Sequence, residues 1–284
     1  MRIITLSLHG CKAGTDAHSG KIRPSGIRDA IGGWSGGSTR RNVDFLRSVE
    51  YSQLTGMGVC FTGTLKHCPP TSDHWHRIRK AYFDRLRRMG VIRIHWVTEW
   101  QRRGVPHLHG MFFFPVTMCS MNVRMTLIKH WIELTTAYGA LPVSQHAIMM
   151  HDALGWAQYS AKHASRGVGH YQRSPENVPT EWQHKTGRVW GKTGEWPTRD
   201  PMKFHVADDV YYRFRRMARS WRISDARVSK SRYRIKAARR CLVANTRTLS
   251  DVRGVSEWLP LDTATALLFW ASTLSDRDNA VCQV

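Results

Sequence analysis

The sequence predicts an α+β fold, in which helices pack on a central antiparallel β-sheet and a basic, mostly helical C-terminal extension follows. The first reason is the order of periodic segments between residues 57 and 164: strand, helix, hairpin, helix, strand, helix. The second is composition, because 42% of the 284 residues are hydrophobic and 10% are aromatic, which is enough for a folded core. The third is a concentration of basic residues after residue 208.

The first strand and helix are predicted between residues 59 and 90. Val59–Leu65 is typical of a strand, and the Pro69-Pro70 pair ends it. From Ser72 to Met89, apolar residues recur at spacings of three and four, which predicts a helix. Ser72 is the expected N-cap, and Gly90 lies where a C-cap glycine belongs.

A hairpin and further elements follow. Residues 91–100 and 107–114 are rich in β-formers and are separated by a turn with Gly104, so they predict two paired strands. Helices are then expected near 121–138 and 153–164, with a short strand at 143–150 between them. Residues 165–205 contain four prolines and are predicted to be rich in loops.

These patterns divide the chain into three parts. Residues 1–54 are rich in Gly, Ser and Arg and are predicted to be a flexible leader. Residues 55–207 are predicted to form the α+β domain. Residues 208–284 are predicted to form a basic, mostly helical DNA-binding extension.

The net charge indicates a polyanionic partner. Lys and Arg total 43 against 21 Asp and Glu, a formal charge of +22. Between Arg213 and Arg240 there are 12 basic residues and one acid. The aromatic residues in and just before this segment are candidates to stack on unpaired bases: Tyr211, Tyr212, Phe214, Trp221 and Tyr233. The expected phosphate-binding residues are Arg213, Arg215, Arg216, Arg219, Arg222, Lys230, Arg232 and Arg234.

Other function classes are disfavoured. No apolar run approaches the length of a membrane span, and polar residues follow the first few residues too closely for a signal peptide, so an intracellular, cytoplasmic protein is expected. The six cysteines form no C-x-x-C pair, which disfavours a disulfide scaffold and a structural zinc site. We expect reduced thiols.

The most informative segment is Glu99-Trp-Gln-Arg-Arg-Gly-Val-Pro-His107-Leu-His109. Side chains alternate along a strand, so His107 and His109 project to one side. If the chain turns at Arg103-Gly104, Glu99 comes opposite both histidines. Two imidazoles and a carboxylate on one wall predict a divalent-metal site; the alternative is two half-buried histidines on an ordinary strand.

This segment resembles motif 2 of the HUH endonucleases, and most closely that of rolling-circle replication initiators from filamentous phages and small plasmids. The resemblance implies a ferredoxin- or RRM-like sheet, with Mg²⁺ or Mn²⁺ held by Glu99, His107 and His109. It also implies a nucleophilic tyrosine on a downstream helix in a Y-x-x-K context. Tyr159 and Lys162 match that context, and Phe61–Leu65 would be motif 1. Gly187-Arg-Val-Trp-Gly191 resembles a segment common in the phage-type initiators, for which the sequence suggests no chemical role.

The resemblance implies an enzyme that nicks single-stranded DNA or an origin hairpin by tyrosine transesterification. The products would be a 5′-phosphotyrosine linkage and a free 3′-OH primer, and the reverse step would rejoin strands. A host helicase and polymerase are the expected partners. Where some relatives carry a second tyrosine, this chain has His163; Tyr171 is the nearest other candidate.

Two other functions remain open from the sequence. One is a single-tyrosine HUH transposase, which the Glu99-containing motif disfavours. The other is a non-catalytic, metal-stabilised DNA-binding protein, with His107, His109 and Cys60 or Cys68 as zinc ligands.

Overall fold

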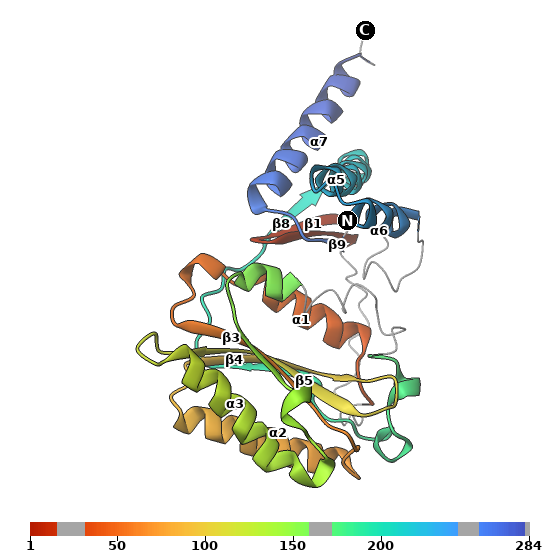
Figure 1. Ribbon diagram of the computed structural model, residues 1–284. Coiled ribbons are helices and arrows are strands. Elements are labelled where there is room, and N and C mark those ends of the chain that lie inside the picture. Colours follow the sequence, from red (N-terminus) through yellow and green to blue (C-terminus); the bar gives the residue numbers. More distant parts are fainter. Residues whose placement is uncertain (16–31, 159–171, 244–255, 282–284) are drawn as a thin grey trace. The chain divides into compact units, whose positions relative to one another are not determined.

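A computed structural model describes residues 1–15, 32–158, 172–243 and 256–281 (Figure 1). The chain forms two compact units. The central unit comprises residues 25–43 and 51–197, and the terminal unit comprises residues 1–24, 44–50 and 198–284. Both units contain antiparallel sheets and helices, so the predicted α+β class is confirmed.

The central unit is built on a five-stranded antiparallel sheet in the order β6-β3-β5-β4-β7. Its strands are β3 (Met57–Thr64), β4 (Arg93–Trp100), β5 (Pro106–Phe114), β6 (His146–Met149) and β7 (Trp190–Thr193). The predicted hairpin is confirmed, because β4 and β5 pair antiparallel along their length. β7 lies in the segment predicted to be loops; it has only four residues, too few for a period-2 pattern to stand out.

Two helices cover one face of this sheet. Figure 1 shows α2 (Ser72–Arg88) and α3 (Ser120–Thr135) together on the same side. Between them and the sheet lies an aromatic core, in which the Tyr82 ring is within 6.1 Å of the ring centroids of Phe61, Phe112 and Trp131. Tyr82 is fully buried, and its hydroxyl donates a hydrogen bond to the Leu127 carbonyl of α3. This core fixes the strands that carry the histidines.

The caps of α2 differ in detail from the prediction. Thr71, and not Ser72, is the N-cap, and its side chain accepts a hydrogen bond from the His74 amide. Met89 is the C-cap, and Gly90 follows it with a φ of 85°, the left-handed region that glycine adopts most easily. The prediction placed the start one residue late because Thr71 and Ser72 both have capping hydroxyls.

The described part of the central unit also contains α1 (Gly36–Ser48), whose residues up to Val43 belong to this unit, and a helix over residues 153–158. Short 3-10 turns connect the elements: η1 (Tyr51–Gln53), η2 (Thr136–Tyr138), η3 (Pro142–Ser144), η4 (Pro175–Asn177) and η5 (Thr180–Trp182).

The terminal unit brings both ends of the chain into one sheet, in the order β8-β1-β2-β9. The strands are β1 (Arg2–Ser7), β2 (Gly10–Thr15), β8 (Met202–Val206) and β9 (Ser256–Glu257). The helices are α5 (Asp208–Val228), α6 (Arg232–Val243) and α7 (Leu261–Val281). Buried residues of β1 and β2 pack with Phe214 and Ala218 of α5 and with Leu267 of α7 in a second hydrophobic core.

The structure therefore corrects the predicted leader over residues 1–54. Ile4 and Leu6 alternate with more exposed residues in β1, and Cys11 and Ala13 do so in β2, which is the period of a half-buried hairpin. The glycine-rich segment also begins a helix: Ser35 Oγ accepts a hydrogen bond from the Ser38 amide at the start of α1.

The predicted boundary at residue 207 also differs from the observed one. β8 pairs with β1, so the terminal unit resumes at Thr198 and includes the strand that precedes the basic helix. Among the described residues, no helix combines the length and the apolar character that crossing a membrane requires.

Candidate metal centre

The site predicted on the hairpin is formed by the paired ends of β4 and β5. Glu99 lies directly opposite His107, and Trp100 opposite Pro106. Gly104 makes the predicted turn with a φ of 75°, and its amide donates to the Gln101 carbonyl. This register places Glu99 across from one histidine and diagonal to the other.

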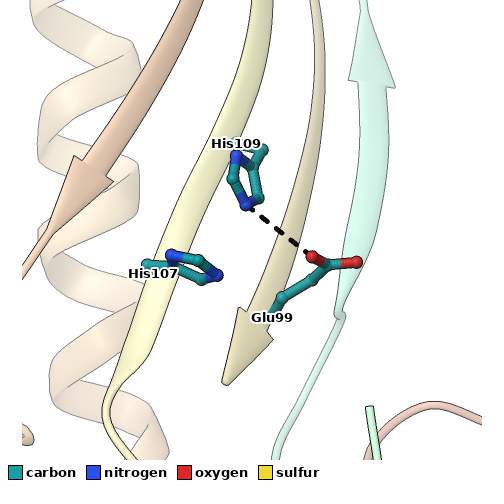
Figure 2. Close-up of side chains that lie close together, drawn as sticks. All are labelled: Glu99, His107 and His109. Atoms are coloured by element: carbon teal, nitrogen blue, oxygen red, sulfur yellow. Dashed lines mark ion pairs between the residues drawn. The ribbon is translucent and has the colours of Figure 1, made fainter. Parts of the chain in front are cut away.

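The three side chains converge on one face of the sheet (Figure 2). Nε2 of His109 lies 3.7 Å from Oε2 of Glu99, and the ring centroids of the two histidines are 4.4 Å apart. One ligand atom from each of the three residues lies within 4.8 Å of the other two. Glu99 is fully buried and His107 and His109 are partly exposed, but Oε2 of Glu99 and Nε2 of both histidines are themselves buried.

The donor set fits a divalent cation. Nitrogen and oxygen ligands lie about 2.0–2.2 Å from such an ion, so two ligands of one ion are at most about 4.4 Å apart. The 3.7 Å between Glu99 and His109 satisfies this limit without movement. Imidazole nitrogens and a carboxylate oxygen are ligands of divalent metals, and three protein ligands leave coordination positions for water or substrate.

Neighbouring strands orient one of the histidines. Thr62 lies opposite His109 on β3, and its Oγ1 is 3.0 Å from Nδ1 of His109. When Nε2 binds a metal it is unprotonated, so in the metal-bound site the ring proton would lie on Nδ1 and be donated to the Thr62 hydroxyl. This hydrogen bond holds the ring with Nε2 toward Glu99.

One residue of the site was not predicted. Arg173 is fully buried, and its Nε and Nη2 donate to Oε1 of Glu99 at 2.9 and 2.7 Å. It lies 74 residues from Glu99 in the sequence, in the loop-rich segment, and no spacing pattern connects the two.

Comparison with known proteins places the chain in a family. The chain is 47% identical over 271 residues to a replication-associated protein of Pseudomonas phage Pf3, covering 95% of this chain and 97% of the relative. It is 43% identical over 288 residues to a protein of Xylella fastidiosa strain 9a5c that is named as a replication protein, covering 99% of both chains. The chain belongs to this family of replication proteins.

A second Xylella fastidiosa relative, from strain Temecula1, is also named as a replication protein; it is 42% identical over 265 residues, covering 91% of this chain and 99% of the relative. No family model and no solved structure matches the chain.

The predicted nucleophile, Tyr159, lies outside the described residues, as do Lys162, His163 and Tyr171. The residues immediately before Tyr159, 153–158, are helical.

The Gly187–Gly191 segment has a structural role. Gly187 has a φ of 66°, and a Cβ there would lie 1.8 Å from Nε2 of His76 on α2. The Val189 carbonyl accepts from the Thr98 amide, and β7 then continues along β4. This segment therefore borders the strand that carries Glu99.

The cysteines suggested as zinc ligands are not part of the three-ligand cluster, which the described residues form from Glu99, His107 and His109. Burial raises the pKa of the Cys60 thiol to about 12, and burial, with a smaller contribution from Glu181, raises that of Cys68 to about 11. Both thiols are therefore protonated at neutral pH when no metal is bound.

The basic segment after residue 208 is only partly a free surface. Tyr211 and Phe214 are core residues of the terminal unit, so these two cannot stack on bases, whereas Tyr212 and Tyr233 are exposed. Trp221 packs partly buried against the same core.

The predicted phosphate-binding residues differ in their contacts and exposure. Arg213 donates to the Ala271 carbonyl of α7, and Arg215 lies over the rings of Tyr211 and Tyr212. Arg216, Lys230 and Arg232 are exposed, Arg219 and Arg222 are partly exposed, and the side chain of Arg234 is outside the described part.

Proposed function

We propose that this protein initiates replication as an HUH endonuclease that nicks single-stranded DNA. The observation that carries the proposal is the convergence of Glu99, His107 and His109 on one hairpin, in a chain that belongs to a family of replication proteins. Either feature alone would fit many proteins. Together they support a metal-assisted reaction on DNA.

In this proposal Glu99, His107 and His109 hold Mg²⁺ or Mn²⁺. The cation would act as a Lewis acid on the phosphate that is cut. Parts of both histidine side chains are exposed, and the proposal requires the phosphodiester to approach the cation from that side.

The proposed nucleophile is Tyr159. Its phenolic oxygen forms a bond to phosphorus while the bond from phosphorus to the 3′-oxygen breaks, and the phenolic proton is balanced by the proton that the 3′-oxygen gains. The products are a 5′-phosphotyrosine linkage and a free 3′-OH, which a host polymerase extends as a primer. Because one phosphodiester replaces another, the reverse step rejoins strands without ATP.

Lys162 is proposed to assist this step by its charge. An ammonium group near the phenol lowers the cost of forming the phenolate, whose ordinary pKa is about 10. The exposed basic residues of α5 and α6 are proposed to bind the DNA backbone and to keep the strand close to the site.

The test is incubation of the full chain with single-stranded DNA from its own replicon and Mn²⁺, followed by denaturing electrophoresis. A covalent protein–DNA band is expected, together with a cut strand that ends in 3′-OH. Tyr159→Phe should give neither product, and Tyr171→Phe should give both. If wild-type protein leaves the DNA intact, the endonuclease proposal is wrong; if the adduct maps to Tyr171, the nucleophile is wrong.

A further inference from the structure

The carboxylate of Glu99 is held on the side away from the histidines by Arg173. Two N–H groups of the guanidinium, Nε and Nη2, donate to the same oxygen, Oε1. Both side chains are fully buried. Charge-assisted hydrogen bonds of this kind are stronger than neutral ones, and the planar guanidinium fixes their direction.

Arg173 is itself held from its other side. Its Cζ lies 3.9 Å from the ring centroid of Trp34, a stacking distance, and Trp34 is buried. The indole Nε1–H of Trp34 donates to the carbonyl of Thr98 at 2.8 Å, which is the residue before Glu99. The guanidinium of Arg173 therefore lies between the carboxylate of Glu99 and an indole that is hydrogen-bonded to the same strand.

A second backbone contact anchors the segment that carries Arg173. The amide of Trp100, the residue after Glu99, donates to the Gln172 carbonyl at 2.9 Å. Backbone contacts on both sides of Glu99 thus fix the positions of Trp34 and Arg173. These contacts hold the Arg173 backbone and the stacking indole close to Glu99.

The consequence is that the two oxygens of Glu99 have different roles. Oε1 is bound by Arg173, and Oε2 lies 3.7 Å from Nε2 of His109. A carboxylate that gives one oxygen to a guanidinium offers only the other to a cation, so it binds in a monodentate way. Mn²⁺ and Mg²⁺ accept few protein ligands, whereas Ca²⁺ prefers more oxygens and often takes both from one carboxylate.

We propose that Arg173 is a positioning residue, which limits Glu99 to monodentate coordination and so favours small divalent cations over Ca²⁺. This proposal rests on the assignment of Glu99, His107 and His109 as the metal ligands. The competing role is structural: a buried ion pair that attaches the Gln172–Arg173 segment to the sheet and has no influence on the metal.

Arg173→Lys tests the proposal, because it keeps the charge and loses the planar pair of N–H donors. The matched control is Arg79→Lys: Arg79 is also buried and stacks on an indole, that of Trp96 at 3.7 Å, but it does not contact the three ligands. For each protein, Mn²⁺ affinity is measured from the electron paramagnetic resonance of the free ion, Ca²⁺ affinity by competition, and stability by thermal melting with EDTA.

Arg173→Lys should weaken Mn²⁺ binding about 10- to 100-fold, the usual effect of losing a group that orients a metal ligand. Ca²⁺ binding should weaken less, so the ratio of Ca²⁺ to Mn²⁺ affinity should rise. Arg79→Lys should lower the melting temperature and leave both affinities unchanged. If Arg173→Lys unfolds the protein, Trp34→Phe, which removes the bond to Thr98, should change the ratio in the same direction.

An Arg173→Lys protein that melts earlier but keeps the wild-type ratio would show that the ion pair is only structural. Wild-type protein that binds Mn²⁺ but does not nick DNA would overturn the proposed function and leave the role of Arg173 intact. Wild-type protein that binds neither cation would overturn both.

Discussion

Nε2 of His95 lies 2.8 Å from Oδ1 of Asn42, and both side chains are almost completely buried in the central unit. Burial, with a smaller repulsion from Lys192, lowers the pKa of His95 to about 3. The imidazole is therefore neutral in the folded protein and donates its Nε2 proton to Asn42. In the unfolded chain the same group has a pKa of about 6.5.

This difference predicts that acid destabilises the protein through His95. Between about pH 6.5 and pH 3 the unfolded state binds the extra proton, so the free energy of unfolding falls as the pH is lowered, by at most about 1.4 kcal/mol per unit. Above about pH 6.5 His95 is neutral in both the folded and the unfolded state, so it no longer makes the free energy of unfolding depend on pH. His95→Gln should have a shallower pH dependence in urea titrations from pH 7 to pH 4. The exposed His67→Gln should keep the wild-type dependence; equal slopes for wild type and His95→Gln would contradict the prediction.

A second prediction concerns the hydroxyl that orients His109. Thr62→Val removes the acceptor of the Nδ1 proton and conserves the side-chain shape, so the ring loses its fixed tautomer and direction. Mn²⁺ affinity should fall about 10- to 100-fold. Thr62→Ser keeps the hydroxyl and should bind nearly as wild type. Calorimetric titration with Mn²⁺ distinguishes them, and wild-type affinity in Thr62→Val would show that the hydroxyl does not orient the ligand.

Local patterns predicted the hairpin and the convergence of Glu99, His107 and His109, because both depend on short-range geometry. A period of two and a glycine turn at Gly104 are enough to place Glu99 opposite His107. Arg173 and Trp34 could not be found this way, since they reach Glu99 through tertiary packing from distant segments. The strand β1 could not be predicted from local patterns. It is short, a glycine-rich run follows the hairpin that it forms with β2, and its other partner, β8, lies about 200 residues away in the sequence.

The histidines themselves give the third prediction. A His107→Ala, His109→Ala double variant should lose Mn²⁺ binding and metal-dependent nicking, while DNA affinity in EDTA is mostly retained because phosphate contacts are made elsewhere. His146→Ala is the control: His146 is exposed on β6, opposite Thr62, and does not belong to the cluster. Filter binding and nicking assays test both. Full cleavage by the double variant would refute the metal assignment.

Glu99→Gln is a less specific variant than the histidine changes. It would leave the buried guanidinium of Arg173 without its carboxylate, and removing one partner of a buried pair typically destabilises by about 3–5 kcal/mol. A loss of activity in Glu99→Gln would therefore reflect both the missing carboxylate and a lower fraction of folded protein.

Gly187 gives a prediction about stability. In Gly187→Ala the new Cβ would meet Nε2 of His76 at 1.8 Å, and His76 is itself bonded to Arg79, so it cannot easily move aside. Together with the positive φ, this should destabilise by roughly 2–4 kcal/mol. Gly90→Ala separates the two effects, because Gly90 has a φ of 85° but open space around it. Chemical denaturation should show the larger loss at Gly187; equal losses would mean that the contact with His76 relaxes.

The last prediction concerns how the terminal unit binds DNA. Deleting residues 208–284 is not a usable test, because α5 and α7 supply half of the core that covers β1 and β2. Exposed charges can be changed instead. Replacing Arg216, Lys230 and Arg232 with Gln should weaken binding to single-stranded DNA and flatten its dependence on salt, by about 0.7 in the log–log slope for each phosphate that the variant no longer neutralises.

A matched triple change of Arg77, Arg88 and Lys129, exposed on α2 and α3, removes the same charge from the central unit. If net charge alone attracts DNA, both triple variants should change the slope equally; if α5 and α6 contact the backbone, only the first should. Fluorescence anisotropy with a labelled oligonucleotide at several salt concentrations measures the slope, and an unchanged slope in the first variant would mean that this basic surface is merely solvated.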